Sequence, residues 1–344
     1  MKKIVICDTA LASSNVGDEI ILDSICNSMS DVFDENFCLR LATHVNNFSA
    51  KQVAHSYVKQ FLHRGTKIKY FQQADWKFVC GTNLIAQKRL FKINTQWKLY
   101  PSNLSIYKNC VLIGVGTYGS SDKFDLYGRM IYNRVLSREY AHSVRDELTK
   151  KLIESLGRRA INTGCPTLWS LTPEHCRRIP VGKADNCIIS VSGYRPQTDP
   201  KIDAKMIEVV RKNYKNVQVW IQTTEDEYYL DSLPGGSELK RIYSLKRYRQ
   251  ALQEGNVDYV GTRLHGGVFA MQNRCRSLIV SIDHRAEGFH KTNNLPILRR
   301  EEIPDRLESV INSEFATEIV LDSDAIAEFK SQFSGSENKV YESK

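Results

Sequence analysis

Short apolar runs rich in β-branched residues alternate along the chain with longer segments whose apolar residues recur at helical spacing. This alternation is typical of parallel strands joined by crossover helices. The runs that we interpret as strands are residues 4–7, 78–80, 110–113, 143–145, 187–192, 217–222, 259–261 and 278–282. The pattern predicts an α/β protein built from Rossmann-like, doubly wound parallel sheets.

Two helices are predicted with defined ends. The first follows a polar turn at residues 13–18, after which Ile21, Ile25 and Met29 share one helical face. The second covers residues 147–156, because Asp146 is a good N-cap and Gly157 a good terminator.

The alternation breaks between about residues 163 and 186, where prolines, glycines and charges replace the apolar runs. A break of this kind is typical of a domain boundary. We therefore expect an N-terminal domain over residues 1–175, a C-terminal domain over residues 184–333 and a frayed tail over residues 334–344. Two such domains would face a cleft, with ligands at the carboxyl ends of the strands.

Composition supports a globular protein. Of 344 residues, 42% are hydrophobic and 25% are charged, which excludes a disordered or collagen-like chain. No apolar stretch approaches the ~20 residues that span a bilayer, so we expect a soluble, cytoplasmic protein. Nine cysteines without a C-x-x-C spacing indicate reduced thiols, and eight histidines without an H-x-x-x-H pair give no indication of a metal. We expect no cofactor.

The net charge of +9 favours an anionic partner, and on charge alone nucleic acid, phosphate esters and anionic membranes all stay open. Residues 240–300 hold twelve Lys or Arg against four Asp or Glu. Five of these cations are interpreted as the solvated face of one helix over residues 240–249, namely Lys240, Arg241, Lys246, Arg247 and Arg249. Arg263 and Arg285 differ, because each lies at the end of a predicted strand.

The densest chemical signal lies at residues 259–270, where a strand runs into a turn and a helix begins near His265. Gly266 and Gly267 would leave the backbone N–H groups of the first helical turn open to an anion. Arg263 offers a planar fork for carboxylate or phosphate, and His265 can exchange a proton near neutral pH. The alternative is tight helix–sheet packing at the glycines beside a surface Arg and His. The residues alone do not decide between the two.

The Arg263-Leu264-His265-Gly266 segment resembles the signature of the polysaccharide pyruvyl transferase family. Three further segments resemble family motifs in the same order, and the resemblance extends to about Phe289. These segments are Asn15-Val16-Gly17-Asp18 for N-x-G-D, Ser143-Val144-Arg145-Asp146 for S-x-R-D, and Ile282-Asp283-His284-Arg285 for Y-D-x-K.

The resemblance implies a glycosyltransferase-B-like pair of Rossmann-type domains, with the acceptor on the N-terminal side and the donor on the C-terminal side. It implies transfer of the enolpyruvyl unit of phosphoenolpyruvate to two hydroxyls of a sugar, giving a cyclic pyruvate ketal and phosphate. The acceptor would be a polysaccharide repeat unit or its polyprenyl-diphosphate-linked precursor. Contact with the inner face of the cytoplasmic membrane stays open.

The resemblance also implies roles for single residues. Arg145 and Arg263 would hold the donor carboxylate and phosphate, and His265 would transfer the proton. Arg285 stands where the family often has lysine, so the charge is kept, but an arginine cannot act as an acid or base. On this basis we expect Arg263→Ala to weaken donor binding and His265→Ala to slow turnover, with both variants melting near the parent temperature.

Two glycine-containing loops have more than one interpretation. In the Asn15-Gly17-Asp18 loop, Asp18 would bond acceptor hydroxyls from the other domain, or Asp18 is a helix cap and Gly17 a turn residue. Residues 114–119 match G-x-G-x-x-G, but polar residues follow instead of an apolar helix. Nicotinamide binding is therefore not favoured.

Two other functions compete with pyruvyl transfer. A nucleotide-sugar glycosyltransferase of the same architecture commonly carries two glutamates eight positions apart in its C-terminal half. Here Glu139 and Glu147 form the single such pair, and it lies in the N-terminal half. A non-catalytic binder of anions or nucleic acid agrees with the charge, but no nucleic-acid motif supports it.

Overall fold

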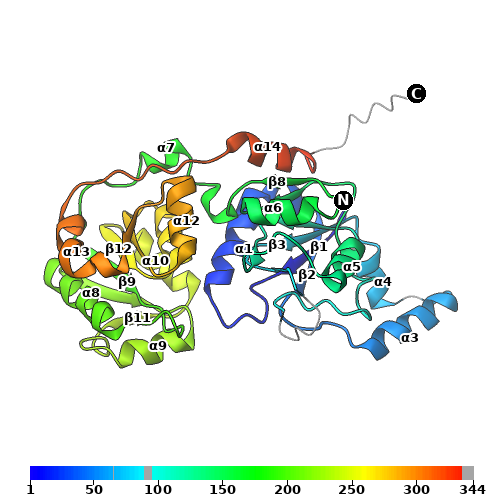
Figure 1. The fold of residues 1–344 in the computed structure, drawn as a ribbon, viewed down its shortest axis with the longest axis horizontal. Helices are drawn as coiled ribbons and strands as arrows, with labels where there is room; N and C mark the ends of the chain where they lie inside the picture. The colour runs from blue at the N-terminus through cyan, green and yellow to red at the C-terminus, as the bar shows by residue number, and fades with distance from the viewer. Residues whose placement is uncertain (65, 89–94, 335–344) are drawn as a thin grey trace. The chain divides into compact units, whose positions relative to one another are not determined.

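The computed structural model describes residues 1–64, 66–88 and 95–334. Its contacts divide the chain into two compact units (Figure 1). Unit 1 contains Met1–Ser13, Ile21–Trp169 and the described residues from Asp322 onward. Unit 2 contains Ser14–Ile20 and Ser170–Leu321. The expected tail, 334–344, lies outside the described residues except for Ser334.

Unit 1 is built on a parallel sheet of order β2-β1-β3-β5, with the short pairs β4-β6 and β7-β8 beside it. Its strands are β1 (Lys3–Asp8), β2 (Phe37–Ala42), β3 (Trp76–Cys80), β4 (Ile85–Ala86), β5 (Cys110–Ile113), β6 (Thr117–Tyr118), β7 (His142–Val144) and β8 (Ala160–Asn162). Its helices are α1 (Gly17–Ser28), whose first turn counts with unit 2, α2 (Ser30–Phe33), α3 (Ala50–Phe61), α4 (Lys67–Gln72), α5 (Leu126–Val135), α6 (Glu147–Glu154), η1 (Pro166–Leu168) and α14 (Ser323–Ser331).

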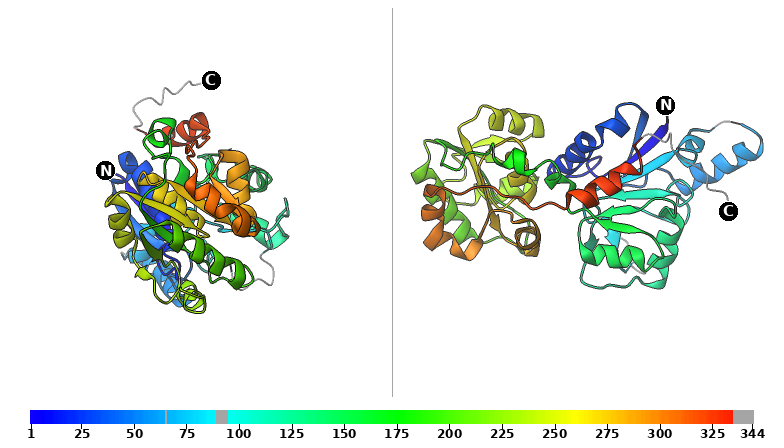
Figure 2. Two further views of the ribbon diagram at one scale, coloured as in Figure 1. Left: turned by 90° about the vertical axis from the view of Figure 1, so that its left-hand side faces the viewer. Right: turned by 90° about the horizontal axis from the view of Figure 1, so that it is seen from above.

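Alternate residues of β1 enter two different apolar clusters in unit 1. Val5 and Cys7 belong to the cluster that contains Ile131 of α5, and Ile4 belongs to the cluster that contains Phe329 of α14. Because successive side chains of a strand point to opposite faces, both faces of this sheet are covered. Figure 2 shows α14, in red, against unit 1.

Unit 2 is a six-stranded parallel sheet of order β11-β10-β9-β12-β13-β14. This is the 3-2-1-4-5-6 order of the Rossmann fold. Its strands are β9 (Asn186–Ser190), β10 (Asn216–Trp220), β11 (Lys240–Ile242), β12 (Val257–Gly261), β13 (Ser277–Ser281) and β14 (Ile297–Arg299). Its helices are α7 (Pro173–Cys176), α8 (Pro200–Asn213), α9 (Thr224–Asp231), α10 (Leu245–Gln253), α11 (Leu264–Gln272), α12 (His284–Asn293), η2 (Arg300–Glu302) and α13 (Ile303–Asn312).

Helices cover both faces of the unit 2 sheet. Ile189 of β9 shares a cluster with Met206 of α8, whereas Tyr259 of β12 lies against Gly267 of α11. The central strands β12 and β13 are buried at every position, as strands covered on both faces must be. Two Rossmann-like, doubly wound units are thereby confirmed.

The eight predicted strands are all present within about two residues of their expected bounds. The predicted helix after Asp146 is also present, with the Asp146 carboxylate accepting a bond from the Thr149 N–H at 2.7 Å. Lys240 and Arg241, in contrast, lie in β11 and not on a helix. The interpretation of residues 240–249 as one helical face was therefore wrong for its first part.

The two units differ from the expected division of the chain at both ends. Residues 14–20 make their contacts in unit 2, and the segment after Asp322 returns to unit 1. There Phe329 and Phe333 are buried beside Phe78 and Trp76. All nine cysteines lie in the described part of the chain, and each is a free thiol. Among the described residues, no helix is long and apolar enough to cross a membrane.

Candidate active site

The strand order of unit 2 reverses between β9 and β12, so the loops that follow these two strands flank the switch point. In open α/β sheets, ligands bind at this place outside the carboxyl ends of the strands. The loop after β9 begins at Val191, and Arg263 with His265 follow β12 directly. The structure therefore places the Arg-Leu-His segment where a Rossmann-like sheet binds its ligand.

Arg263 is held by a buried carboxylate. Its Nε donates to Asp226 Oδ2 at 2.9 Å, and its Nη2 donates to Asp226 Oδ1 and, at 3.2 Å, to Thr223 Oγ1. The Asp226 side chain is fully buried, and that of Arg263 is 14% exposed. These contacts use Nε and Nη2 of Arg263. The N–H groups of Nη1 take no part in them and could bind a ligand.

Asp226 also connects three loops at this edge of the sheet. It accepts hydrogen bonds from the Gly193 N–H at 2.9 Å and from the Gln222 and Thr223 N–H groups at 3.3 Å. It stands at the third position of α9, where it forms a capping box with Thr223. One carboxylate therefore fixes the loops after β9 and β10 and the guanidinium that follows β12.

The backbone of Arg263 is fixed as well. Its N–H donates to Ser190 Oγ at 3.0 Å, and its carbonyl accepts from the Tyr259 hydroxyl at 2.8 Å and from the Gly267 N–H at 3.1 Å. Burial raises the pKa of Tyr259, so its hydroxyl stays protonated and can donate. Both ends of this residue are thus set by the strands on either side of the switch point.

His265 and Gly266 lie in the first turn of α11, and His265 is half-buried. Gly267 differs from the expectation, because its N–H already bonds the Arg263 carbonyl and is not open to an anion. A Cβ on Gly267 would lie 2.5 Å from Ile279 Cγ1 and 2.8 Å from Tyr259 Cε1. Gly267 is therefore a packing glycine.

The N-terminal loop docks on the end of β10 within unit 2, and not from the other domain as expected. Asn15 Oδ1 accepts from the Gly17 N–H at 2.9 Å and from Gln222 Nε2 at 3.2 Å, while the Val16 N–H donates to the Gln222 carbonyl at 3.0 Å. A Cβ on Gly17 would lie 2.6 Å from Gln222 Nε2, so a larger residue here would displace the Gln222 amide. The side chain that caps the start of α1 is Asn15, and Asp18 lies buried in its first turn.

Arg285 is exposed and folds back on its neighbour Asp283. Its Nε and Nη2 donate to Asp283 Oδ2 at 3.0 and 2.7 Å, and Gln197 Nε2 donates to the same oxygen at 3.2 Å. Burial of Asp283 opposes ionisation, but the bonds and charge of Arg285 prevail and hold the pKa of Asp283 below its usual value. Asp283 is therefore a carboxylate at neutral pH and a poor proton donor.

Arg145 lies in unit 1, directly after β7. Its Nη2 donates to Asn83 Oδ1, and its Nε is 3.8 Å from Asp146 Oδ2. The guanidinium lies over Gly116, where a Cβ would collide with it. The glycine-rich segment 114–119 contains β6, and the next helix begins only at Leu126. In unit 1 its glycines make room for Arg145 and, at Gly114, for Pro166.

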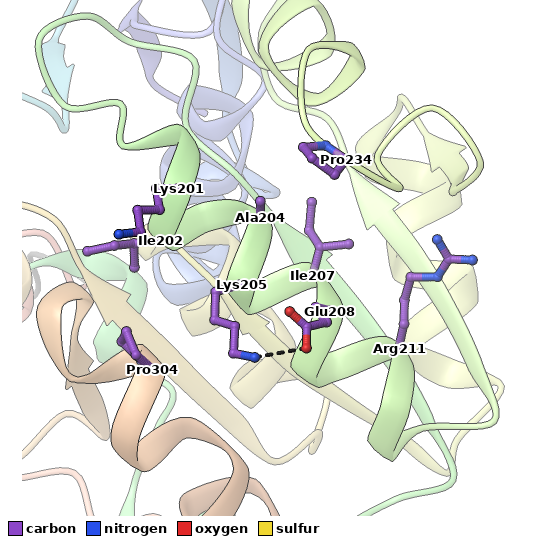
Figure 3. Close-up of a pocket in the computed structure, with 9 residues that line it drawn as sticks. All are labelled: Lys201, Ile202, Ala204, Lys205, Ile207, Glu208, Arg211, Pro234 and Pro304. Carbon is purple, nitrogen blue, oxygen red and sulfur yellow. Dashed lines mark hydrogen bonds and ion pairs between the residues drawn. The ribbon is translucent and has the colours of Figure 1, made fainter.

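The metal-binding potential and the grooves of the described residues can be compared with this arrangement. Among the described residues, no group of three or more His, Cys, Asp or Glu side chains is placed to hold a metal ion. A groove of about 650 Å³ lies over α8, lined by residues such as Ile207, Lys205 and Pro304 (Figure 3). It includes none of the residues described above.

Sequence reasoning missed Asp226, Gln222 and Gly193. Thr223-x-x-Asp226 is a recognisable capping pattern, so a helix start could have been predicted there. Nothing local links Asp226 to Arg263, which lies 37 positions away. That pairing follows from the parallel sheet, which brings the ends of β10 and β12 to one edge.

The model of the polysaccharide pyruvyl transferase family matches residues 15–284 of this chain. No curated protein matches this chain. Similar solved structures include the UDP-GlcNAc 2-epimerase of Methanocaldococcus jannaschii in complex with UDP-GlcNAc and UDP, at 12% identity over 96% of this chain and 100% of that one, with a TM-score of 0.49. The UDP-N-acetylglucosamine 2-epimerase of Rickettsia bellii is 11% identical over 96% and 94%, with a TM-score of 0.49. S. aureus MnaA with UDP is 11% identical over 94% of both chains, with a TM-score of 0.48.

Proposed function

This chain belongs to the polysaccharide pyruvyl transferase family, and we propose that its donor is phosphoenolpyruvate and its product a cyclic pyruvate ketal on a sugar. The acceptor would be a polysaccharide repeat unit or its polyprenyl-diphosphate-linked precursor. The observation that carries the proposal is the meeting of Arg263, His265 and the first turn of α11 at the switch point of unit 2.

Phosphoenolpyruvate carries a phosphate and a carboxylate on one small carbon frame, so its site needs several fixed donors. The first turn of α11 favours an anion through the positive end of the helix dipole. The Nη1 edge of Arg263 would add a charge-assisted hydrogen bond. Arg145 and Arg285 remain proposed donor ligands, and Asn15, Gly17 and Asp18 remain proposed substrate contacts.

The reaction has to move two protons. Protonation of the donor's methylene carbon makes the ketal carbon electrophilic, and one sugar hydroxyl adds there and loses its proton. The phosphate then leaves with the bonding electron pair, and the second hydroxyl adds and loses its proton. Over the whole reaction the two sugar hydroxyls lose two protons. The methylene carbon gains one proton and becomes a methyl group, and the released phosphate carries the other.

His265 is the proposed proton-transfer residue, because an imidazole can both give and take a proton near pH 7. It can donate to the methylene carbon or accept from a hydroxyl, and one group can serve both steps in opposite senses. Asp283 is the weaker candidate as a donor, since its lowered pKa leaves it ionised. Arg263 cannot exchange a proton at all, because a guanidinium stays charged.

A melting experiment tests the donor class. Phosphoenolpyruvate at 100 times its dissociation constant should stabilise the folded protein by ~2.7 kcal/mol, which is visible as a rise in Tm. UDP- and GDP-sugars at the same concentration should leave Tm unchanged. A rise with a nucleotide sugar and none with phosphoenolpyruvate would replace this proposal with a glycosyltransferase.

A further inference from the structure

Four arginines lie in the segments that directly follow β9, β12, β13 and β14 of unit 2, and three of them are paired with an aspartate. Arg263 pairs with Asp226, Arg285 with Asp283, and Arg300 with Asp203 at 3.1 Å. The aspartate partners of Arg263 and Arg300 are fully buried. These cations can still donate hydrogen bonds, but nearby carboxylates already offset their charge.

The fourth arginine, Arg195, has no side-chain hydrogen bond or ion pair with any residue that the structure describes. Its side chain is exposed, on the loop that joins β9 to α8. Because β9 is one of the two strands at the switch point, this loop lies beside the end of β12. Arg195 therefore brings a full positive charge to the edge where the other three are offset.

The loop that carries Arg195 is fixed by hydrogen bonds on both sides of this residue. The Gly193 N–H is bonded to Asp226, the same carboxylate that holds Arg263. On the other side, Gln197 donates to Asp283, and its carbonyl accepts from Arg300 Nη1. Residues 194–197 between these hydrogen bonds form a turn, in which the Gln197 N–H donates to the Tyr194 carbonyl at 2.8 Å.

The hydrogen bonds of Gly193 and Gln197 limit how far Arg195 can lie from the candidate active site. It is two residues from Gly193 and two from Gln197, and two residues of extended chain span at most about 7 Å. Gly193 itself is pressed against the Glu225 carbonyl, where a Cβ would not fit. The backbone under Arg195 is thus held near both the Arg263–Asp226 pair and the Arg285–Asp283 pair, while its side chain stays open to solvent.

We infer that Arg195 supplies the uncompensated positive charge that binds the phosphate group of the donor. The inference rests on the proposed function, which requires a phosphate monoester of about −1.5 to −2 charge near pH 7, with a carboxylate beside it. A pair such as Arg263–Asp226 has no net charge to offer this anion. An unpaired guanidinium offers both charge and a bidentate fork.

The test compares Arg195→Gln with Arg195→Lys and with Arg177→Gln as the matched control. Arg177 is an exposed arginine of unit 2, also without a side-chain partner among the described residues, and it follows α7. Calorimetry gives the Kd for phosphoenolpyruvate, and phosphate release gives the KM for donor and acceptor separately. Arg195→Gln should raise donor Kd and KM by about 10- to 100-fold, the range of a lost charge-assisted contact.

The remaining readouts separate binding from folding. Arg195→Gln should keep the parental Tm and acceptor KM, Arg195→Lys should recover part of the affinity, and Arg177→Gln should stay within twofold of the parent. Donor Kd within twofold of the parent in Arg195→Gln would overturn the inference and leave the proposed function standing. A parent protein that neither binds phosphoenolpyruvate nor releases phosphate from it would overturn both.

Discussion

At the scale of single residues, the structure changes what Arg263 is expected to do. Its guanidinium is paired with a buried carboxylate, in addition to the donor contact proposed for it. The sequence predicted a surface residue whose removal leaves the melting temperature unchanged. The bidentate pair with fully buried Asp226 contradicts that expectation.

Arg263→Ala should therefore lower the free energy of unfolding by about 3–5 kcal/mol, because it leaves Asp226 buried without its cation. Urea unfolding followed by fluorescence measures the loss. Arg178→Ala is the matched control, since Arg178 and Glu174 form an exposed pair worth at most about 1 kcal/mol. Equal stability of the two variants would show that Asp226 does not depend on Arg263.

His265→Ala should reduce turnover by about 10²-fold or more while the Kd for phosphoenolpyruvate changes far less, because the residue is proposed to move a proton and not to hold the donor. Phosphate release and calorimetry on the same sample give both values. His55→Ala, in an exposed position of α3, serves as the control. Near-parental turnover in His265→Ala would transfer proton movement to another group.

At the scale of elements, the glycines of α11 and α12 act differently although both helices follow strands of the same sheet. Gly267 faces Ile279 and Tyr259 at distances that leave no room for a methyl group. Gly288 has nothing within 4 Å of where its Cβ would stand. Helix–sheet distance at the site is thus set by Gly267, and Gly288 has no such role.

Gly267→Ala should cost about 1–3 kcal/mol of unfolding free energy, since α11 must move from the sheet or Ile279 must leave its rotamer. Gly288→Ala should instead stabilise the protein by about 0.5–1 kcal/mol, the helix propensity difference in an open position. Thermal unfolding of both variants checks the opposite signs. A stabilised Gly267→Ala would mean that the contact with β13 is loose.

His142 makes β7 sensitive to acid. It is fully buried, accepts the Leu112 N–H on Nδ1 at 3.2 Å, and lies 3.1 Å from the Ser137 carbonyl through Nε2. Burial is the main cause that lowers its pKa to about 4. The unfolded chain takes up this proton near pH 6.5 and the folded chain only near pH 4, so stability is present above pH 6.5 and falls as the pH drops between these values.

The loss should reach about 3 kcal/mol between pH 6.5 and pH 4, at ~1.4 kcal/mol per pH unit. Urea midpoints from tryptophan fluorescence measure it, since Trp76, Trp97 and Trp169 lie in unit 1. His142→Gln removes the titrating ring, so this part of the slope should disappear. A slope that the substitution leaves unchanged would assign the acid sensitivity to other groups.

At the scale of the whole molecule, the sequence predicts the sheets better than their edges. Runs such as Cys-Ile-Ile-Ser in β9 are buried at nearly every position and are easy to recognise. β2 was missed because Arg40 interrupts its pattern and pairs with Asp8, and β8, β11 and β14 have three residues each. Short or half-exposed strands carry too little pattern to be found alone.

The same limit applies to the site and to the two units. Arg263 and His265 could be found because a strand, a turn and two glycines are contiguous. Asp226 and the docking of Asn15 on Gln222 depend on contacts 37 and 207 positions apart. The helix α14, whose Phe329 completes a core of unit 1, was likewise not predicted from the sequence.

The central claim is that this chain moves the enolpyruvyl unit of phosphoenolpyruvate to a sugar diol. The direct measurement is phosphate release from phosphoenolpyruvate in the presence of β-galactosides and N-acetylhexosamines, with mass spectrometry of each acceptor. The account predicts release that depends on one of these acceptors, with a matching product heavier by one pyruvic acid less one water. Phosphate release without that product, or transfer of a sugar from a UDP- or GDP-sugar to the same acceptors, would contradict it.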